Sequence, residues 1–263
     1  MIKVLKNFNN IPEILNNSKR EEAFDENVVV KKFEFGKDLY KPESVKKKLY
    51  KIYHNKCAYC EKDISDEQRP IEHYRPKDIY YWLAYSWDNL LLSCSRCNTK
   101  KGKQFPVQNI AVQYNNQKLV DTHSLCGAYN KIEKPMIINP EQDDIIADIK
   151  FYANAVMYSE NSRVAHTINK ACGLNRDELV QHRVQIINDF KNILQKYEML
   201  YLKNKDITIF EPIINEFLSK VTEENEYYAF RNFIVKNINI FFESKVIKVI
   251  LKYYIDKEKN GKL

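Results

Sequence analysis

Two Cys-x-x-Cys pairs constrain this sequence more than any other feature. Cys57 and Cys60 form the first pair, and Cys94 and Cys97 form the second. Two such turns supply the four soft ligands of a tetrahedral zinc ion. The gap between the pairs is longer than a compact zinc ribbon needs, so a segment with another task is inserted between them. We therefore expect a closed, structural zinc site that frames a separate chemical site.

The expected compartment supports metal ligation by these cysteines. The N-terminal stretch lacks the apolar core and small-residue cleavage site of a signal peptide, and no run of residues reaches the length of a membrane span. We therefore expect a cytoplasmic protein, in which paired cysteines bind metal rather than form disulfides. Cys126 and Cys172 lack a paired spacing and are expected to be buried structural residues.

The segment between and beside the cysteine pairs carries the residue types that phosphodiester hydrolysis requires. His73 is suited to deprotonating a water molecule, and the oxygens of Glu72 and Asn98 are ligands that a hard divalent ion prefers. Alternation along a strand would direct Glu72 and His73 to opposite sides, so a shared site requires a bend or bulge. If a helix begins near Asn98, Lys101 lies on the same helical face and can meet a phosphate.

These residues carry a resemblance to a known family. Glu72-His73, Asn89 and Asn98, framed by the cysteine pairs, resemble the HNH endonucleases, which have a ββα-metal fold. A weaker likeness extends to the PtuB group of these enzymes, found in Septu and retron-associated anti-phage defence. It is carried by the strings Leu49–Cys60, Ile71–Lys77, Trp82–Tyr85, Trp87–Leu90, Cys94–Lys101, Phe105-Pro106, Ile138–Pro140 and Gly173–Arg176.

The resemblance implies a role for each matching residue. His73 would be the general base, and Asn89 would orient the loop and the base. Glu72 and Asn98 would hold the divalent ion. Two departures matter: many family members have Asp at position 72, and the family name implies His at position 98. An Asn there suits an oxygen-preferring ion, so Mg²⁺ or Mn²⁺ is expected at the catalytic position. The residues expected to contact phosphate are Arg75 and Lys101.

The basic residues are arranged in three runs. The formal net charge is +7, which permits binding to a polyanion without demanding it. A single basic run usually marks a solvated face, but these three converge on the candidate metal site. One run precedes Cys57, one flanks His73 and one follows Cys97. They comprise Lys46, Lys47, Lys48, Lys51 and Lys56, then Arg69, Arg75 and Lys77, then Arg96, Lys100, Lys101 and Lys103.

Hydrophobic periodicity predicts an α+β protein that is predominantly α. With only five glycines and eight prolines, an all-β fold is disfavoured. We expect an N-terminal extension over 1–40, the nuclease core with its zinc knuckles over 41–147, and a helical region over 148–263. The elements expected are a short helix at 11–15, a strand at 27–35, a helix at 43–54, a hairpin and helix within 57–103, one or two strands at 148–158, a helix capped by Asn175 and Glu178 and running to about 202, and helices at 207–220, 225–235 and 239–257.

Two classes of function remain open at this point. The first is a metal-dependent nuclease that works with a partner ATPase of the PtuA type, with DNA the favoured substrate and RNA the alternative. The second is a zinc-stabilised module that binds nucleic acid or protein without cutting it. Paired cysteines and basic runs satisfy either class. The set Glu72, His73 and Asn98 favours the nuclease, because a binding module does not need it.

Overall fold

The computed structural model describes residues 1, 3–34, 38–67 and 71–260. Its contacts divide the chain into two compact units: 1–148 with 159–174 (unit 1), and 149–158 with 175–263 (unit 2). These units are defined by contacts within the chain and not by independent folding. The division predicted from the sequence, into 1–40, 41–147 and 148–263, therefore stays a prediction. None of the helices in the described part of the chain has the length and apolar composition that a membrane crossing requires.

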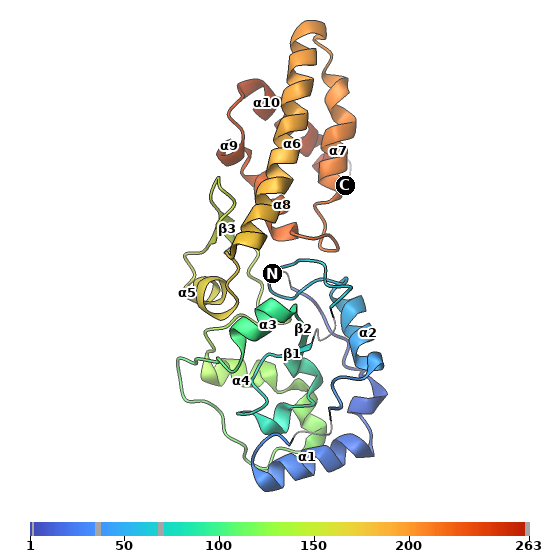
Figure 1. Cartoon of the computed structure of the whole chain (residues 1–263), viewed down its shortest axis with the longest axis vertical. Helices are drawn as coiled ribbons and strands as arrows, with labels where there is room; N and C mark the ends of the chain where they lie inside the picture. The colour runs from blue at the N-terminus through green and yellow to red at the C-terminus, as the bar shows by residue number, and fades with distance from the viewer. Residues whose placement is uncertain (2, 35–37, 68–70, 261–263) are drawn as a thin grey trace. The chain divides into compact units, whose positions relative to one another are not determined.

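Unit 1 is built around one short antiparallel hairpin. Its strands β1 and β2 pair directly, and Figure 1 shows α3 next to them. The predicted hairpin and following helix are confirmed. The elements of unit 1 are α1 (Ser18–Val30), α2 (Glu43–Ile52), β1 (Ile71–His73), β2 (Leu90–Leu92), α3 (Ser95–Lys101), α4 (Cys126–Glu133), α5 (Ser162–His166), a π-helical turn (Thr167–Ala171) and 3₁₀ turns at Glu13–Leu15, Tyr81–Leu83, Trp87–Asn89 and Leu119–Ser124.

An aromatic core of unit 1 includes residues from the segment between β1 and β2. Each of its buried members is at most 7% exposed, so the cluster excludes water. The buried members are Phe24, Tyr80, Trp82, Leu83 and Tyr129.

The strand predicted at 27–35 is wrong over its described part. Residues up to Val30 continue α1, and Lys31 ends that helix in the left-handed conformation. Asn17 caps the helix by accepting a hydrogen bond from the Lys19 N–H, which sets the helical phase upstream of the β-branched run. Packing of Phe24 into the core then outweighs the strand propensity of the valines. Residue 35 lies outside the described residues.

Unit 2 is a helical assembly with one small hairpin. Figure 1 shows α6 and α7 running side by side. Phe190 and Phe217, one on each of these helices, stack with ring centroids 3.9 Å apart. The elements are β3 (Lys150–Phe151), β4 (Met157–Tyr158), α6 (Asp177–Asn204), a 3₁₀ turn (Ile207–Phe210), α7 (Glu211–Ser219), α8 (Tyr228–Lys236), α9 (Ile238–Phe241) and α10 (Lys245–Asn260).

Two predictions about unit 2 need correction. Asn175 does not cap α6; its side chain accepts from the Met157 N–H at 2.8 Å and donates to the Met157 carbonyl at 2.7 Å, which ties β4 to the start of the helix. The helix predicted over 239–257 is interrupted at Phe242, whose backbone is extended and whose ring packs against Phe190. Burial of that ring explains the break, and Ser244 then caps α10 by accepting from the Ile247 N–H.

Candidate active site and metal centre

The four paired cysteines meet in one buried cluster beside the hairpin. Their Sγ atoms all lie within 4.8 Å of one another. Four thiolates about 2.3 Å from a zinc ion stand about 3.8 Å apart, and the Sγ atoms of Cys60 and Cys94 are 3.8 Å apart. Cys94 also caps α3 by accepting from the Cys97 N–H, so the cluster fixes the start of that helix. The donor set and spacing fit a closed zinc site.

The hairpin links this cluster to the candidate catalytic residues. Glu72 pairs with Leu91 and His73 with Leu90 across the two strands. The Ala58 N–H, inside the first cysteine turn, donates to the Leu92 carbonyl at 2.8 Å. The knuckle is therefore joined directly to β2, and its position sets the position of β1.

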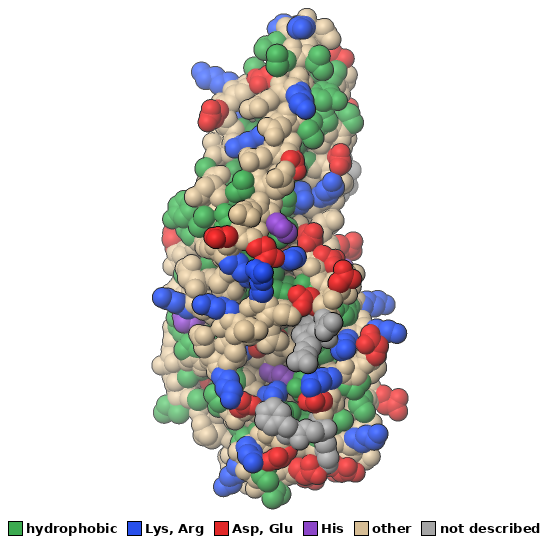
Figure 2. Space-filling view, viewed as in Figure 1, with side chains coloured by type: hydrophobic (Ala, Val, Ile, Leu, Met, Phe, Trp, Pro, Cys, Tyr) green, Lys and Arg blue, Asp and Glu red, His purple; other side chains and the backbone are tan. Residues whose placement is uncertain are grey.

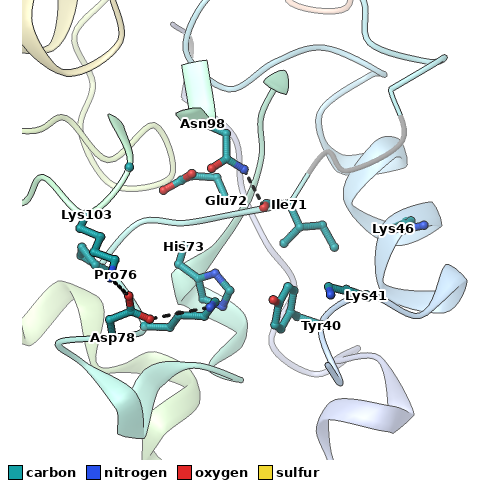
Figure 3. Close-up of a pocket in the computed structure, with 12 residues that line it drawn as sticks. Tyr40, Lys41, Lys46, Ile71, Glu72, His73, Pro76, Asp78, Asn98 and Lys103 are labelled. Atoms are coloured by element: carbon teal, nitrogen blue, oxygen red, sulfur yellow. Dashed lines mark hydrogen bonds and ion pairs between the residues drawn. The ribbon is translucent and has the colours of Figure 1, made fainter. Parts of the chain in front are cut away.

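A pocket of about 580 Å³ opens beside β1 in unit 1. Glu72, His73 and Asn98 all line it, so the structure brings together the base and the two ion ligands predicted from the sequence. Figure 3 shows Glu72 and His73 leaving β1 in different directions, with Asn98 above Glu72. The expected alternation therefore holds, and β1 pairs with β2 in regular register, so the prediction that a shared site requires a bend or bulge is wrong. The pocket instead extends along both side chains. The lining residues are Tyr40, Lys41, Lys46, Ile71, Glu72, His73, Pro76, Lys77, Asp78, Asn98, Gly102 and Lys103.

His73 is held in one tautomer by a backbone carbonyl. Its Nε2 lies 2.8 Å from the Ala84 carbonyl oxygen. A carbonyl oxygen only accepts hydrogen bonds, so Nε2 carries the proton and Nδ1 carries the lone pair. Burial lowers the pKa of His73 to about 3, although the hydrogen bond with the Ala84 carbonyl acts to raise it. The imidazole is thus neutral near physiological pH.

Glu72 forms a buried ion pair with Lys101. The Lys101 Nζ donates to Glu72 Oε1 at 2.5 Å and to the His73 carbonyl at 2.8 Å. Burial raises the pKa of Glu72 to about 7, although the charge of Lys101 acts in the opposite direction. The predicted helix does put Lys101 and Asn98 on α3. However, Lys101 is 0% exposed and its ammonium group is committed to β1 rather than to the pocket surface.

Asn98 presents its carbonyl oxygen toward the pocket. Its Nδ2 donates to the Ile71 carbonyl at 3.0 Å, which orients the amide group. With the nitrogen engaged by the strand, Oδ1 is the atom that remains to bind a cation. Oxygen donors from Glu72 and Asn98 suit a hard divalent ion better than a soft one.

Asn89 forms hydrogen bonds within the segment that connects the two strands. Its Oδ1 accepts from the Arg75 N–H at 2.7 Å, and its Nδ2 donates to the carbonyls of Arg75 and Leu83 at 3.0 and 3.1 Å. The side chain is fully buried and does not line the pocket. These three hydrogen bonds hold the residues that follow His73, which is the position that an orienting role requires.

Arg75 is placed differently from the sequence prediction. Its guanidinium donates to Glu133 Oε2 from Nε at 2.9 Å and from Nη2 at 2.6 Å. Both side chains are 0% exposed. Because this buried ion pair lies in the core of unit 1 and away from the pocket, Arg75 is in no position to contact a phosphate. We therefore reassign it to the support of the hairpin.

Each of the three basic runs contributes one lysine to the pocket: Lys46, Lys77 and Lys103. Lys103 Nζ donates to Asp78 at 2.5 Å. Figure 2 shows basic side chains interspersed with acidic ones on the face that it views, rather than one unbroken basic surface. The sequence reasoning missed Tyr40, Lys41 and Asp78, which belong to no motif and reach the pocket only through the tertiary fold.

The hairpin, α3 and the cysteine cluster have the arrangement of an HNH-type domain. The HNH endonuclease family matches residues 57–104 of this chain, which contain the hairpin, α3 and all four clustered cysteines. This match confirms the class that the motif predicts for the segment.

Beyond that domain, the chain is similar to Septu protein PtuB. It is 33% identical to PtuB of Bacillus mycoides (strain KBAB4) over 198 residues, which cover 69% of this chain and 63% of that protein. It is 40% identical to PtuB of Bacillus thuringiensis over 83 residues, which cover 29% of this chain and 32% of that protein. The predicted resemblance to a PtuB-type HNH nuclease is confirmed, although the chain spans less than two thirds of the length of these relatives.

A third relative bears a different name. Septu protein PtuA of Bacillus mycoides (strain KBAB4) is 27% identical to this chain over 178 residues, which cover 62% of this chain and 23% of that protein. The similarity therefore involves less than a quarter of the PtuA protein.

Proposed function

We propose that this chain is a metal-dependent HNH endonuclease that hydrolyses phosphodiester bonds of nucleic acid. The observation that carries the proposal is the pocket lined by Glu72, His73 and Asn98, with lysines at its rim. Residues of these types supply a general base, oxygen ligands for a divalent ion and positive charge for a polyanion. The similarity to PtuB supports a role as the effector of an anti-phage defence system in the cytoplasm.

His73 acts as the general base. Its Nε2–H donates to the Ala84 carbonyl, so Nδ1 takes the proton from the attacking water. Because burial lowers the pKa of His73 to about 3, the base is unprotonated across the physiological range. Asn89 is the residue that orients this arrangement, since its hydrogen bonds fix the backbone at Arg75.

Two ions have separate tasks in this proposal. Cys57, Cys60, Cys94 and Cys97 would hold a structural zinc ion. Glu72 and Asn98 would hold Mg²⁺ or Mn²⁺, which supplies positive charge for the negative charge that develops on the phosphate. Lys101 balances the buried Glu72 carboxylate rather than meeting the substrate.

DNA is the favoured substrate, and RNA is the alternative, because base, water and ion act on a phosphodiester that both polymers share. Contacts from rim lysines such as Lys46 and Lys103 would position the backbone without reading sequence. A PtuA-like ATPase is the proposed protein partner. The support for this association is that the relatives named PtuB and PtuA both carry the Septu name.

The test is a cleavage assay of the purified chain, with and without its ATPase partner, on labelled DNA and RNA in Mg²⁺ or Mn²⁺. We expect cleavage by the wild type and a loss of about 10³-fold in His73→Ala, since general base catalysis is worth that order. His123→Gln is the matched control, because His123 is also buried and of lowered pKa but lies outside the pocket. It should keep its cleavage rate.

The outcome also separates the two classes of function. If wild type and His73→Ala bind nucleic acid equally and neither cuts under any of these conditions, the chain is a zinc-stabilised binding module. If His73→Ala cuts as fast as the wild type, the assignment of His73 as base is wrong.

A further inference from the structure

One hydrogen bond is not enough to fix the imidazole of His73. The Ala84 carbonyl holds Nε2, but rotation about χ2 of a histidine is soft and broad. A ring that turns over would bring a carbon atom to the place of Nδ1 and remove the base from the water. A second contact is therefore needed to keep one ring orientation.

Tyr40 makes that contact from outside the HNH segment. Its ring lies perpendicular to the His73 ring, at an interplanar angle of 82° and a centroid separation of 4.7 Å. Both residues line the pocket, and Figure 3 shows the two rings facing one another there. Edge-to-face packing of this kind is directional, so it limits ring rotation as well as filling space.

Tyr40 is itself held on several sides. Its ring stacks with Tyr85 at 6.4 Å and 29°, and it contacts Phe33 at 6.4 Å and 54°. Its hydroxyl donates to the Asp38 carboxylate, which also receives a hydrogen bond from the Lys41 ammonium. The Tyr40 side chain is 9% exposed. A ring anchored by stacking and by its hydroxyl is rigid enough to orient its neighbour.

We propose that Tyr40 is a positioning residue that locks the His73 imidazole with Nε2 on Ala84 and Nδ1 available to the pocket. The proposal rests on the function proposed above for His73. It implies that the segment before α2 completes a catalytic site whose family motif begins only at residue 57. The aromatic ring of Tyr40 carries this role, and its hydroxyl serves to anchor the ring.

The kinetic test compares substitutions at Tyr40 in the full chain. Tyr40→Leu should lower kcat roughly 100-fold with little change in KM, because a displaced base slows the reaction without altering substrate binding. Tyr40→Phe keeps the ring and should stay within about fivefold of the wild type, since it loses one hydrogen bond. Phe24→Leu removes a buried ring of unit 1 that lies outside the pocket, and it should keep kcat.

A spectroscopic test does not depend on cleavage. In a ¹⁵N-labelled protein, long-range ¹H–¹⁵N correlations identify the His73 tautomer, with His73→Gln used to assign the signals. We expect the Nε2–H pattern in the wild type and in Tyr40→Phe, and an averaged pattern in Tyr40→Leu. This result would support the positioning role even if the wild type cuts no substrate.

Three results would overturn the proposal. The first is a Tyr40→Leu protein with wild-type kcat in an assay where His73→Ala is inactive. The second is a His73 spectrum unchanged by Tyr40→Leu. The third is an equal loss of kcat in Tyr40→Leu and Phe24→Leu, with equal drops in melting temperature, which would reduce Tyr40 to general packing.

Discussion

The cysteine cluster and the pocket share one hairpin and one helix, but they differ in what surrounds their polar groups. Every thiol of the cluster is buried against the other three, so the cluster is a closed set of ligands. Glu72 and His73 are also nearly buried, yet they line an open space of about 580 Å³. Burial of the cysteines would serve metal binding and stability, whereas burial of Glu72 and His73 shifts the pKa of groups that are proposed to act in catalysis. Substitutions should therefore separate the two effects.

The cysteine cluster gives the largest expected effect. Cys94→Ser removes one sulfur ligand of the cluster, while the serine hydroxyl can still accept the hydrogen bond that caps α3. Metal binding at structural zinc sites contributes about 10–16 kcal/mol, which exceeds or equals the whole stability of a typical domain, about 5–15 kcal/mol. We expect loss of bound zinc and of cooperative unfolding of unit 1. Metal analysis and thermal melting followed by near-ultraviolet circular dichroism measure both.

Cys126→Ser is the matched control for this substitution. Cys126 is buried in the same unit but stands outside the cluster. Placing a hydroxyl at this buried site should cost about 1–3 kcal/mol and leave the zinc content unchanged. Full zinc content and a wild-type melting curve in Cys94→Ser would show that the cluster is not a structural metal site.

Substitution of Arg75 gives the next largest effect. It tests whether Arg75 stabilises the fold or contacts the substrate. Arg75→Met leaves the buried Glu133 carboxylate without its cation, which should cost about 3–5 kcal/mol. The double variant Arg75→Met/Glu133→Gln should recover part of that loss. Urea unfolding of both variants measures this coupling. A phosphate ligand would instead show a raised KM with unchanged stability, and that result would restore the role predicted from the sequence.

Arg75 also illustrates why part of the site was predictable and part was not. The hairpin, α3 and the meeting of Glu72, His73 and Asn98 follow from a local motif with fixed spacings. The direction of the Arg75 side chain depends on Glu133, which lies 58 residues further along the chain. No periodicity or spacing reveals such a partner, so the sequence alone predicts a phosphate ligand at Arg75, two residues from the proposed base.

Lys101 and α1 also show that sequence patterns do not reveal tertiary contacts. Helical spacing correctly predicts that Lys101 shares α3 with Asn98, but the packing of α3 on β1 decides that its ammonium points inward. The β-branched residues within 27–35 predict a strand by composition alone. The cap at Asn17 and the burial of Phe24 override that preference, and only the second of these depends on tertiary contacts.

The two buried histidines allow a comparison through pH. His123 accepts from the Trp87 N–H and donates to the Leu15 carbonyl, and burial lowers its pKa to about 3. The folded pKa is below the unfolded value, so its contribution is present above about pH 6.5 and is lost as pH falls toward 3. Between pH 7 and 5, wild type should lose about 2 kcal/mol more stability than His123→Gln.

Unfolding in urea at both pH values measures this difference. Taking the difference between two proteins cancels the titration of Glu72 and His73, which both retain. Equal losses in the two proteins would mean that His123 is already accessible to protons in the folded state. Cleavage at pH 7 should be unaffected, which keeps His123 apart from the pocket.

The smallest effect is expected at the rim of the pocket. Lys46 lines the pocket from α2, whereas its neighbour Lys47 is exposed and does not. In a His73→Ala background that binds but does not cut, Lys46→Ala should weaken oligonucleotide binding by about 1 kcal/mol and reduce the slope of log K against log salt by about 0.9. Lys47→Ala should change neither. Equal changes in both variants would mean that the helix attracts the polyanion through its overall charge, and that the pocket does not select the position of the phosphate.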